Sequence, residues 1–386
     1  MSLGPSKRGI VPPFIVMDVM RAANEREAQG ENIMHLEVGQ PGTGAPQGVI
    51  DAVAEAVRSD RLGYTDALGI APLRQAIAGH YRGFYGLDVP AERVAVTMGS
   101  SGGFILSFLA AFDAGQSVAL AAPGYPAYRN ILTALGLEVV EIPVGPDTNF
   151  QPTPAHLEAL PSKPDGLIVA SPSNPTGTML GAEGLAAICG YCDANEIRLV
   201  SDEIYHGITY GERAESALRF TEEAIVVNSF SKYFSMTGWR IGWLVVPENH
   251  LRSVERLAQN MFICPPHVSQ LAALAALQSH DEMQENLAVY RENRRLMLQG
   301  LPEAGLTQIA PPDGAFYIYA DISEFGVDSR TFAAEVLQEA GVALTPGLDF
   351  DPIRGGHTIR LSYAQATGEI IEGLRRLKQF MHNRYV

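Results

Sequence analysis

The stretch that decides the fold is the run of segments GLIVASPSNPTG (residues 166–177), RLVSDEIY (198–205) and AIVVNSFSKYF (224–234). Each begins as a short apolar run rich in β-branched residues, which is typical of a buried strand, and each is followed by polar residues or turn formers. The segment GLAAICGYCDANE (184–196) lies between the first two and has the apolar spacing of a helix. Buried strands that alternate with helices predict crossover connections and a mostly parallel sheet with helices on both faces.

The same alternation continues on both sides of this stretch. Further strands are predicted at residues 94–97, 117–123, 138–143 and 242–247, with helices between them. We therefore predict an α/β fold with a mostly parallel seven-stranded sheet between helices. Other helices are predicted at 14–29, 47–59, 71–85 and, with a break at the CPP of 264–266, across 252–300, and a short strand is predicted at 33–38.

The C-terminal part has a different pattern. Strands are predicted at 316–322, 341–346 and 358–364, with helices at 331–339 and 369–382, which indicates a smaller α+β unit. No low-complexity linker separates the two units in the sequence, so we expect the boundary within the long helix near residues 281–290. The prediction is a large domain of residues 40–285 and a small domain built from both chain ends, 1–39 and 286–386.

Composition narrows the possible partners. The chain has 386 residues, of which 28 are Lys or Arg and 43 are Asp or Glu, so its formal net charge is −15. Such an acidic chain is a poor partner for nucleic acid or an anionic membrane, although a small anionic ligand needs only a local basic pocket. The start, MSLGPSKRGIVPPF, has no apolar core of a signal peptide. The longest apolar stretch, residues 102–112, is shorter than the roughly 18 residues of a membrane span.

Three cysteines, Cys189, Cys192 and Cys264, are too few to crosslink a chain of this length. Their odd number and spacing predict reduced thiols and a cytoplasmic protein. Cys189 and Cys192 form a C-x-x-C pair, which makes redox chemistry or zinc binding alternatives to a structural role. The sequence has no second C-x-x-C or histidine pair at finger spacing, so we expect buried structural thiols and no metal site.

Chemically distinctive residues follow the predicted strands, at the edge where open α/β sheets bind ligands. Lys232 follows an apolar strand, where a lysine held away from bulk solvent can act as an amine nucleophile. Asp202 ends a buried strand, where a carboxylate is costly unless it is paired. Asn174 lies in a loop rich in Pro and Gly, and GSSGG (99–103) opens a helix whose free N–H groups can bind an anion.

Each of these features alone has an ordinary structural explanation, such as a surface lysine, a turn residue or a common helix start. Their combination is more specific. Pyridoxal phosphate needs an amine for its aldehyde, an acid opposite its pyridine nitrogen, and donors to its phenolate and phosphate. Lys232, Asp202, Asn174, Tyr205 and the guanidinium of Arg240 together offer this set.

The stretches SPSNPTG (171–177), SDEIY (201–205) and SFSKYFSMTGWRIGW (229–243) resemble the signature motifs of class I/II aminotransferases, the fold-type I pyridoxal phosphate enzymes of the aspartate aminotransferase superfamily. The pattern S-x-S-K-x-x-x-M-T-G-W-R-x-G in the last of them is highly specific. The resemblance covers almost the whole chain, from GQP near residue 40 to RLSYA near residue 361. It implies an enzyme that moves an amino group from an L-amino acid to a 2-oxo acid by ping-pong chemistry on pyridoxal 5'-phosphate.

Transferred position by position, the resemblance implies a role for each site residue. Lys232 bonds to the cofactor and moves the substrate proton, Asp202 pairs with the pyridine nitrogen, and Tyr205 and Asn174 bind the phenolate oxygen. The ring of Tyr125 stacks on the cofactor. The phosphate is held by Ser100, Ser101, Gly102, Ser229 and Arg240, and by Tyr64 from the neighbouring subunit, which implies a homodimer with shared active sites.

The substrate side is less determined. Arg360, in HTIRLSY, resembles the arginine that binds the substrate α-carboxylate, which Gly39 approaches through its backbone. The loop GQPGTGAP (39–46) departs from the acidic pattern of many relatives, and no residue is evident as a second arginine for a dicarboxylate. Phe14, Ile15, Phe316 and Tyr317 either border an apolar substrate side chain or are core residues.

Three functions are compatible with these motifs. The first is an aminotransferase acting on small amino and 2-oxo acids. The second is a carbon–sulfur β-lyase, because the same lysine and electron sink permit elimination. The third is a non-catalytic regulator that binds the cofactor, which the acidic charge and the absence of a preceding DNA-binding segment in the sequence make the least favoured.

Overall fold

Seven strands form the central sheet of the larger part of the molecule, in the order β2-β8-β7-β6-β5-β3-β4. The computed structural model describes residues 3–385. In it β8 runs antiparallel to β2 and β7, and the other neighbours are parallel, so the predicted mostly parallel seven-stranded sheet is confirmed. The strands are β2 (Val94–Thr97), β3 (Ser117–Ala122), β4 (Glu138–Pro143), β5 (Gly166–Ala170), β6 (Arg198–Asp202), β7 (Ile225–Ser229) and β8 (Gly242–Val245).

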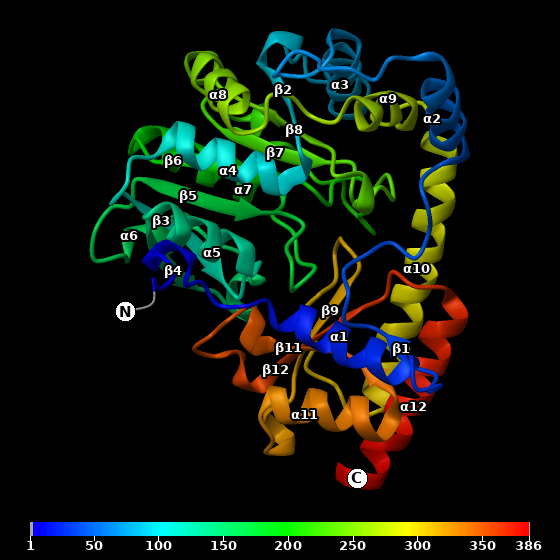
Figure 1. The fold of residues 1–386 in the computed structure, drawn as a ribbon. Helices are drawn as coiled ribbons and strands as arrows, with labels where there is room; N and C mark the ends of the chain where they lie inside the picture. Colours follow the sequence, from blue (N-terminus) through cyan, green and yellow to red (C-terminus); the bar gives the residue numbers. More distant parts are fainter. Residues whose placement is uncertain (1–2, 386) are drawn as a thin grey trace.

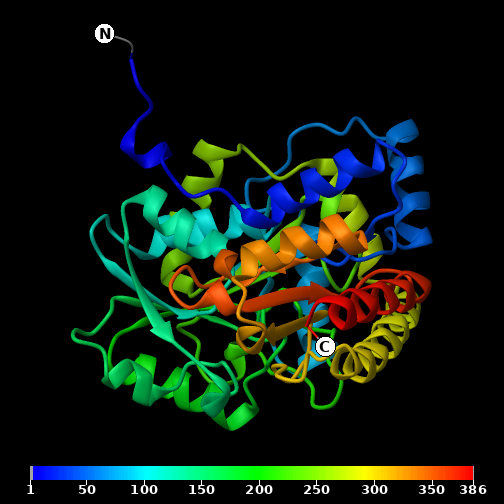
Figure 2. The same cartoon turned by 90° about the horizontal axis from the view of Figure 1, so that it is seen from below.

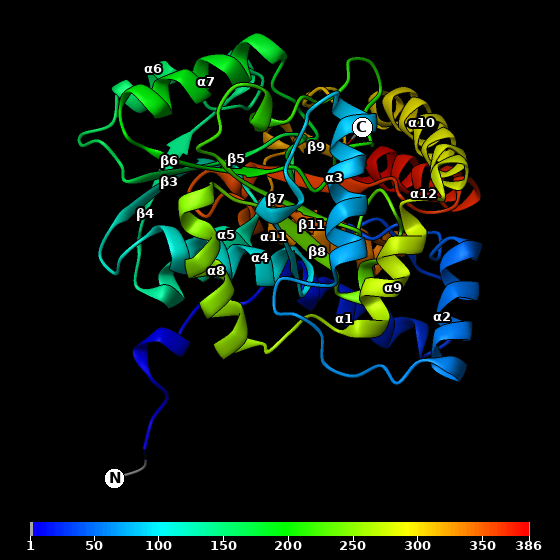
Figure 3. The ribbon, with the colours of Figure 1, turned by 90° about the horizontal axis from the view of Figure 1, so that it is seen from above.

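Helices cover both faces of this sheet because successive strand residues point to opposite sides. In β5, Leu167 and Val169 belong to one apolar cluster and Ile168 belongs to the other. The first cluster includes residues of α3, α6 and α7, and the second includes residues of α4, α5 and α8. Figure 3 shows α6 and α7 on one side of the strands and α4, α5 and α8 on the other. The bounds are α3 (Ala71–Tyr85), α4 (Gly99–Ala111), α5 (Pro126–Leu135), α6 (Pro154–Glu158), α7 (Ala182–Ala194) and α8 (Glu248–Met261).

Both chain ends contribute to the smaller part. Its antiparallel sheet has the order β11-β12-β9, and a separate parallel pair joins β1 near the N-terminus to β10. Helices α1, α11, α12 and the end of α10 surround these strands (Figure 2). The bounds are β1 (Met34–His35), β9 (Tyr317–Asp321), β10 (Val342–Ala343), β11 (Thr345–Pro346), β12 (Thr358–Ser362), α1 (Ile15–Glu27), α11 (Ser329–Glu335) and α12 (Thr367–Tyr385).

One long helix, α10 (His280–Glu303), runs from the larger part into the smaller part (Figure 1). Beside its start, α2 (Gln47–Ser59) packs against α9 (His267–Ala276). The pairing of β1 with β10 and the course of α10 agree with a small domain built from both ends. The domain boundaries at residues 40 and 285 stay a prediction.

Two strand predictions are wrong in detail. Residues 341–346 were expected to form one strand, but they form β10 and β11, which pair with β1 and β12 respectively. The strand expected at 33–38 is reduced to the two residues of β1. The Leu36 N–H still donates to the Ala343 carbonyl oxygen (3.0 Å), but the Leu36 carbonyl oxygen accepts from the Ser362 N–H of β12 (2.6 Å), and the Glu37 carbonyl oxygen accepts from the side chains of Thr345 (3.0 Å) and Arg360.

The C-x-x-C pair lies on α7 as two free, buried thiols inside the apolar cluster. Burial raises the pKa of Cys189 and of Cys192 to about 12, so both thiols are protonated and unreactive at neutral pH. This placement agrees with a structural role. No helix within residues 3–385 is both long and apolar enough to cross a membrane.

Candidate active site

A cavity of about 300 Å³ lies at the carboxyl ends of the parallel strands, bordered by α1, β9 and β12 of the smaller part. The sheet topology explains why its polar residues meet. Asp202 is the last residue of β6, Asn174 follows β5, and Lys232 follows β7. These three strands are adjacent and parallel, so their ends share one edge of the sheet.

Most residues expected at the site line this cavity, namely Gly39, Ser100, Ser101, Tyr125, Asn174, Asp202, Tyr205, Lys232, Arg240 and Arg360. Gly102 and Ser229 lie outside its lining; Ser229 is buried, and its hydroxyl accepts a hydrogen bond from the Ser231 N–H (2.9 Å). Tyr64 also lies outside the lining, and 84% of its surface is exposed in this single chain. Phe14 and Tyr317 line the cavity, whereas Ile15 and the fully buried Phe316 do not.

Lys232 enters the cavity from the loop after β7. Its Nζ donates a hydrogen bond to the Gly39 carbonyl oxygen (2.6 Å). Burial, with the positive charges of Arg360 and Arg240, lowers the pKa of Lys232 from 10.5 to about 8. A side chain at position 39 would collide with the Tyr317 hydroxyl, so the backbone can approach here only as glycine. At pH 7 roughly a tenth of Lys232 is therefore a neutral amine, far more than at its ordinary pKa, and this is the form that acts as a nucleophile and base.

Asp202 is buried and has two hydrogen-bond donors. The Tyr128 hydroxyl donates to one carboxylate oxygen, and the Ile204 N–H donates to the other (3.0 Å). Burial raises the pKa of Asp202 to about 6, and these two hydrogen bonds oppose that rise. The Tyr128 ring is fixed edge-on against Phe104 and Tyr125, with ring centroids 5.0 and 5.4 Å away. Asp202 is thus fixed by two hydrogen bonds and is mostly ionised at pH 7.

An anion site lies on the other side of the cavity. Ser100 and Ser101 occupy the first turn of α4, where backbone N–H groups have no helical acceptor. The Arg240 guanidinium lies against this turn, so close to Gly99 that a side chain at position 99 would collide with it. Gly99 also has a φ of 68°, which favours glycine. Arg240 Nη1 also donates to the Thr237 carbonyl oxygen (2.9 Å). A helix start together with a guanidinium suits a phosphate group.

Arg360, on β12, is only 3% exposed, and its hydrogen-bond partners within residues 3–385 are an amide, a carbonyl and a hydroxyl oxygen, not a carboxylate. Its Nη1 donates to Asn174 Oδ1 (2.8 Å) and its Nη2 to the Glu37 carbonyl oxygen, whereas its Nε has no acceptor among the described residues. The guanidinium carbon lies 4.5 Å from the ring centre of Tyr317 and 4.7 Å from that of Phe350. Because a buried cation without a counterion is costly, this arrangement fits an anionic ligand.

The remaining wall is apolar and comes from α1. Phe14, Val16 and Met17 line the cavity, and the Phe14 ring lies 5.9 Å from the ring of Tyr125. The start of α1 is held by Asp349, whose carboxylate accepts hydrogen bonds from the N–H groups of residues 15 (2.9 Å) and 16 (3.2 Å). Within residues 3–385 the cationic side chains that line the cavity are those of Lys232, Arg240 and Arg360.

Sequence reasoning missed Tyr128 and the wall residues Val16 and Met17. Tyr125 is the residue before α5 and Tyr128 lies in its first turn, with their ring centroids 5.4 Å apart, so the pair of tyrosines in PGYPAY (123–128) was the available signal. Val16 and Met17 have no such signal, because any amphipathic helix contains residues of this kind.

Comparisons with known proteins agree with this geometry. The family model described as aminotransferase class I and II matches residues 31–377. The valine–pyruvate aminotransferase of Mycobacterium tuberculosis is 51% identical over 378 residues, which cover 97% of each chain. The (5-formylfuran-3-yl)methyl phosphate transaminase of Methanocaldococcus jannaschii is 35% identical, over 96% of this chain and 97% of that one.

Solved structures give the same result. The crystal structure of an aminotransferase from Mycobacterium tuberculosis superimposes with a TM-score of 0.97 at 50% identity, over 99% of this chain and all of that one (100%). The match spans both the large sheet and the part built from the chain ends. The chain therefore belongs to the class I and II aminotransferase family.

Proposed function

We propose that this cavity is the active site of an aminotransferase that moves an amino group between an L-amino acid and a 2-oxo acid. Members of this family use pyridoxal 5'-phosphate. The observation that carries the proposal is a partly neutral Lys232 in the same cavity as a buried Arg360 that lacks a counterion. The relatives' names support transamination over the β-lyase and regulator alternatives.

The residues fit the cofactor group by group. Asp202 would face the pyridine nitrogen, Asn174 and Tyr205 the phenolate oxygen, and the ring of Tyr125 one face of the cofactor. The start of α4 and Arg240 would hold the phosphate. When bound, pyridoxal phosphate supplies an electrophilic carbon and a ring that accepts electrons.

Within this arrangement Lys232 has two tasks. Its neutral amine would be the nucleophile that holds the bound cofactor, and once a substrate amine had taken its place it would be the base for the substrate α-proton. Burial, with the positive charges of Arg360 and Arg240, lowers the pKa of Lys232 and so favours the neutral amine that both tasks need. Asp202, as a carboxylate, would favour a protonated pyridine nitrogen in the bound cofactor.

We also propose substrates of a defined class. Arg360 would bind the α-carboxylate through a two-pronged contact that a lysine could not reproduce. The side chain would then face Phe14, Val16 and Met17, with no further cation for a second carboxylate among the described lining residues. Neutral, mainly aliphatic amino acids fit this wall, and the 51% identical relative is named for valine and pyruvate.

A half-reaction screen tests this function. Purified protein loaded with pyridoxal phosphate is mixed with single L-amino acids, and the cofactor absorbance and the 2-oxo acid formed are followed. We expect conversion by L-valine and L-alanine, little by L-aspartate, and restoration of the starting spectrum by pyruvate. Lys232→Ala should lose the absorbance of the covalently held cofactor.

Two results would contradict the proposal. One is continuous 2-oxo acid formation from an amino acid without any acceptor, which is lyase behaviour. The other is a Lys232→Ala protein with the spectrum and conversion rate of the unaltered chain.

We propose further that two chains form a homodimer with shared sites. The support is Tyr64, which resembles a residue that reaches the partner's phosphate and is exposed here. The next residue, Thr65, donates its N–H to Cys264 Sγ (3.5 Å), and the apolar side chains of Val57, Met261 and Ile263 are also exposed. A cytoplasmic location agrees with the free thiols of Cys189 and Cys192.

A further inference from the structure

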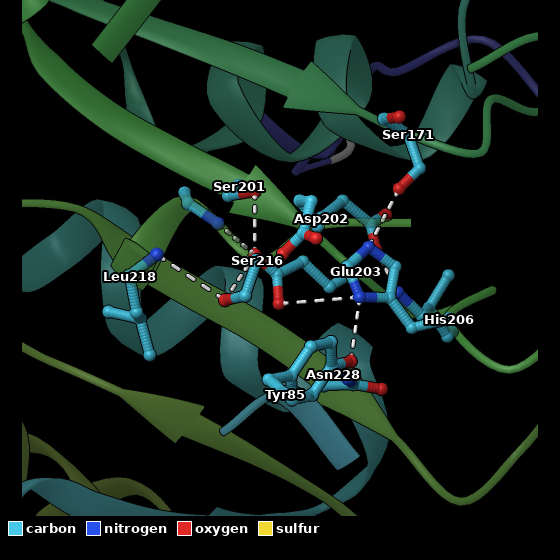
Figure 4. Close-up of polar contacts among 12 residues, drawn as sticks. Tyr85, Ser171, Ser201, Asp202, Glu203, His206, Ser216, Leu218 and Asn228 are labelled. Atoms are coloured by element: carbon cyan, nitrogen blue, oxygen red, sulfur yellow. Dashed lines mark hydrogen bonds and ion pairs between the residues drawn. The ribbon is translucent and has the colours of Figure 1, made fainter. Parts of the chain in front are cut away.

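A buried chain of polar groups lies behind the site and has no assigned task in the chemistry above (Figure 4). His206 is its centre. One ring nitrogen, Nδ1, lies 2.7 Å from the Tyr85 hydroxyl of α3, and the other, Nε2, lies 2.9 Å from the Ser171 carbonyl oxygen. His206 and Tyr85 are buried, with 6% and 5% exposure.

These two contacts fix the protonation of the ring. A carbonyl oxygen can only accept, so Nε2 must carry the hydrogen and donate it to Ser171. Burial lowers the pKa of His206 to about 3, so the ring is neutral and Nδ1 is an acceptor. The Tyr85 hydroxyl must then donate to Nδ1. The hydrogen bonds are therefore donated in one direction, from Tyr85 to His206 and from His206 to the Ser171 carbonyl oxygen.

These hydrogen bonds connect the two loops that carry residues proposed to bind the cofactor. His206 directly follows Tyr205 and closes a turn with Asp202 and Glu203, in which the His206 N–H donates to the Glu203 carbonyl oxygen (3.0 Å). Ser171 begins the loop after β5 that carries Asn174 three residues later. The imidazole thus joins the loop of Asp202 and Tyr205 to the loop of Asn174.

Glu203 anchors the same turn from the other side. Its Oε1 accepts hydrogen bonds from the Ala217 N–H (2.9 Å), the Ser216 hydroxyl (3.0 Å) and the Ser201 hydroxyl (3.2 Å). Burial raises the pKa of Glu203 to about 8. The Glu203 Oε2 is 3.7 Å from His206 Nδ1, beyond hydrogen-bond distance, so Tyr85 remains the partner of that nitrogen.

We propose that His206 is a positioning residue for the cofactor: its neutral ring holds the Ser171 carbonyl and thereby sets the distance between the Asn174 loop and the loop of Asp202 and Tyr205. This inference rests on the proposed function. It assigns His206 no contact with cofactor or substrate, because within residues 3–385 the cavity lining does not include it.

The test uses the full chain loaded with pyridoxal phosphate and four variants. His206→Leu removes both hydrogen bonds, His206→Gln keeps a side-chain N–H that can reach Ser171, and Tyr85→Phe removes only the donor to Nδ1. Tyr81→Phe is the matched control. Tyr81 is one turn earlier on α3, is also buried, and accepts a hydrogen bond from Trp243 Nε1 (3.2 Å) instead.

The readouts are the pH midpoint of the absorbance of bound cofactor, kcat, KM and the melting temperature. The midpoint depends on hydrogen bonds to the phenolate oxygen, so mere loss of stability does not move it. We expect His206→Leu to shift it by about half a pH unit or more and to lower kcat by roughly tenfold or more, as misplaced groups do. In His206→Gln both the pH midpoint and kcat should be close to those of the unaltered chain. In Tyr85→Phe both values should lie between those of the unaltered chain and those of His206→Leu.

A midpoint and kcat in His206→Leu equal to those of Tyr81→Phe would overturn the inference. If His206→Leu does not fold, the comparison of Tyr85→Phe with Tyr81→Phe decides in the same way. If the unaltered chain shows no cofactor absorbance or no half-reaction, the proposed function fails, and that result is distinguishable because it needs no variant.

Discussion

The burial that lowers the pKa of Lys232 also lowers the stability of the folded protein at neutral pH. Its folded pKa of about 8 lies below its ordinary value of 10.5, so between these pH values the unfolded chain binds more protons than the folded chain. The resulting loss of stability is complete below about pH 8 and disappears as the pH rises toward 10.5. We therefore expect Lys232→Met to stabilise the cofactor-free protein at pH 7, by about 3 kcal/mol at most, because water in the cavity screens part of the effect.

Urea unfolding of the cofactor-free chains at several pH values checks this prediction. The gain of Lys232→Met over the unaltered chain should be largest at pH 7 and should shrink above pH 8. Lys378→Met is the control, because Lys378 is exposed and pairs with Glu303 on the surface (2.8 Å). A gain that is equal for both variants, or independent of pH, would show that Lys232 is not strained by burial.

Single residues were predictable where their chemistry is unusual for their place in the sequence. Each of Lys232, Asp202 and Arg360 follows or lies within an apolar strand, and all three line the cavity. Tyr128 and His206 were not predictable, because a tyrosine on a helix and a histidine in a turn are common. Their partners, Asp202 and the Ser171 carbonyl, are distant in sequence and become visible only when α5 and the two loops are placed on the sheet.

At the level of elements, helix α1 forms a wall of the substrate cavity, and Asp349 fixes its start. We expect Asp349→Ala to raise KM for L-valine several-fold and KM for L-alanine less, because a longer side chain reaches further toward Val16 and Met17. Cofactor affinity should not change, since Asp349 does not line the cavity. Loss of the two N–H contacts should also lower stability by about 1 kcal/mol.

Steady-state kinetics with both amino acids measure the effect, and Asp328→Ala is the control. Asp328 accepts hydrogen bonds from the N–H groups of Arg330 and Thr331 at the start of α11 (3.1 Å each), and neither Asp328 nor α11 lines the cavity, so its loss should lower stability without altering KM. Equal changes in KM for valine and alanine in Asp349→Ala would mean that α1 does not select the side chain.

Most elements could be read from the sequence because they are long, periodic and bounded by clear signals. The helices α2 and α3 have the predicted limits, residues 47–59 and 71–85. The run 341–346 could not be divided in advance, because its apolar pattern is continuous. It becomes two strands because Val342 pairs with Met34, which is distant in sequence, while Thr345 pairs with Arg360 on a different strand.

For the whole molecule, the sequence order predicted a middle part and a part made from both ends, and the site lies where they meet. The net charge of −15 did not reveal the cavity, because Lys232, Arg240 and Arg360 form a local cationic site within an acidic chain. The side of this cavity that we propose for the phosphate includes exposed groups in a single chain. Arg240 is exposed, and Tyr64 is exposed outside the cavity.

The proposed homodimer predicts that two inactive chains can restore activity together. If Tyr64 serves the partner's phosphate site, a mixed dimer of Lys232→Ala with Tyr64→Ala has one site with both defects and one intact site. After unfolding and refolding an equal mixture, random pairing should give roughly a quarter of the unaltered activity, provided Tyr64→Ala alone is nearly inactive. The mixture is compared with each variant refolded alone, and sedimentation confirms the dimer. If Tyr64 serves its own chain, every mixed dimer has one defect in each site, and the mixture stays as inactive as its components.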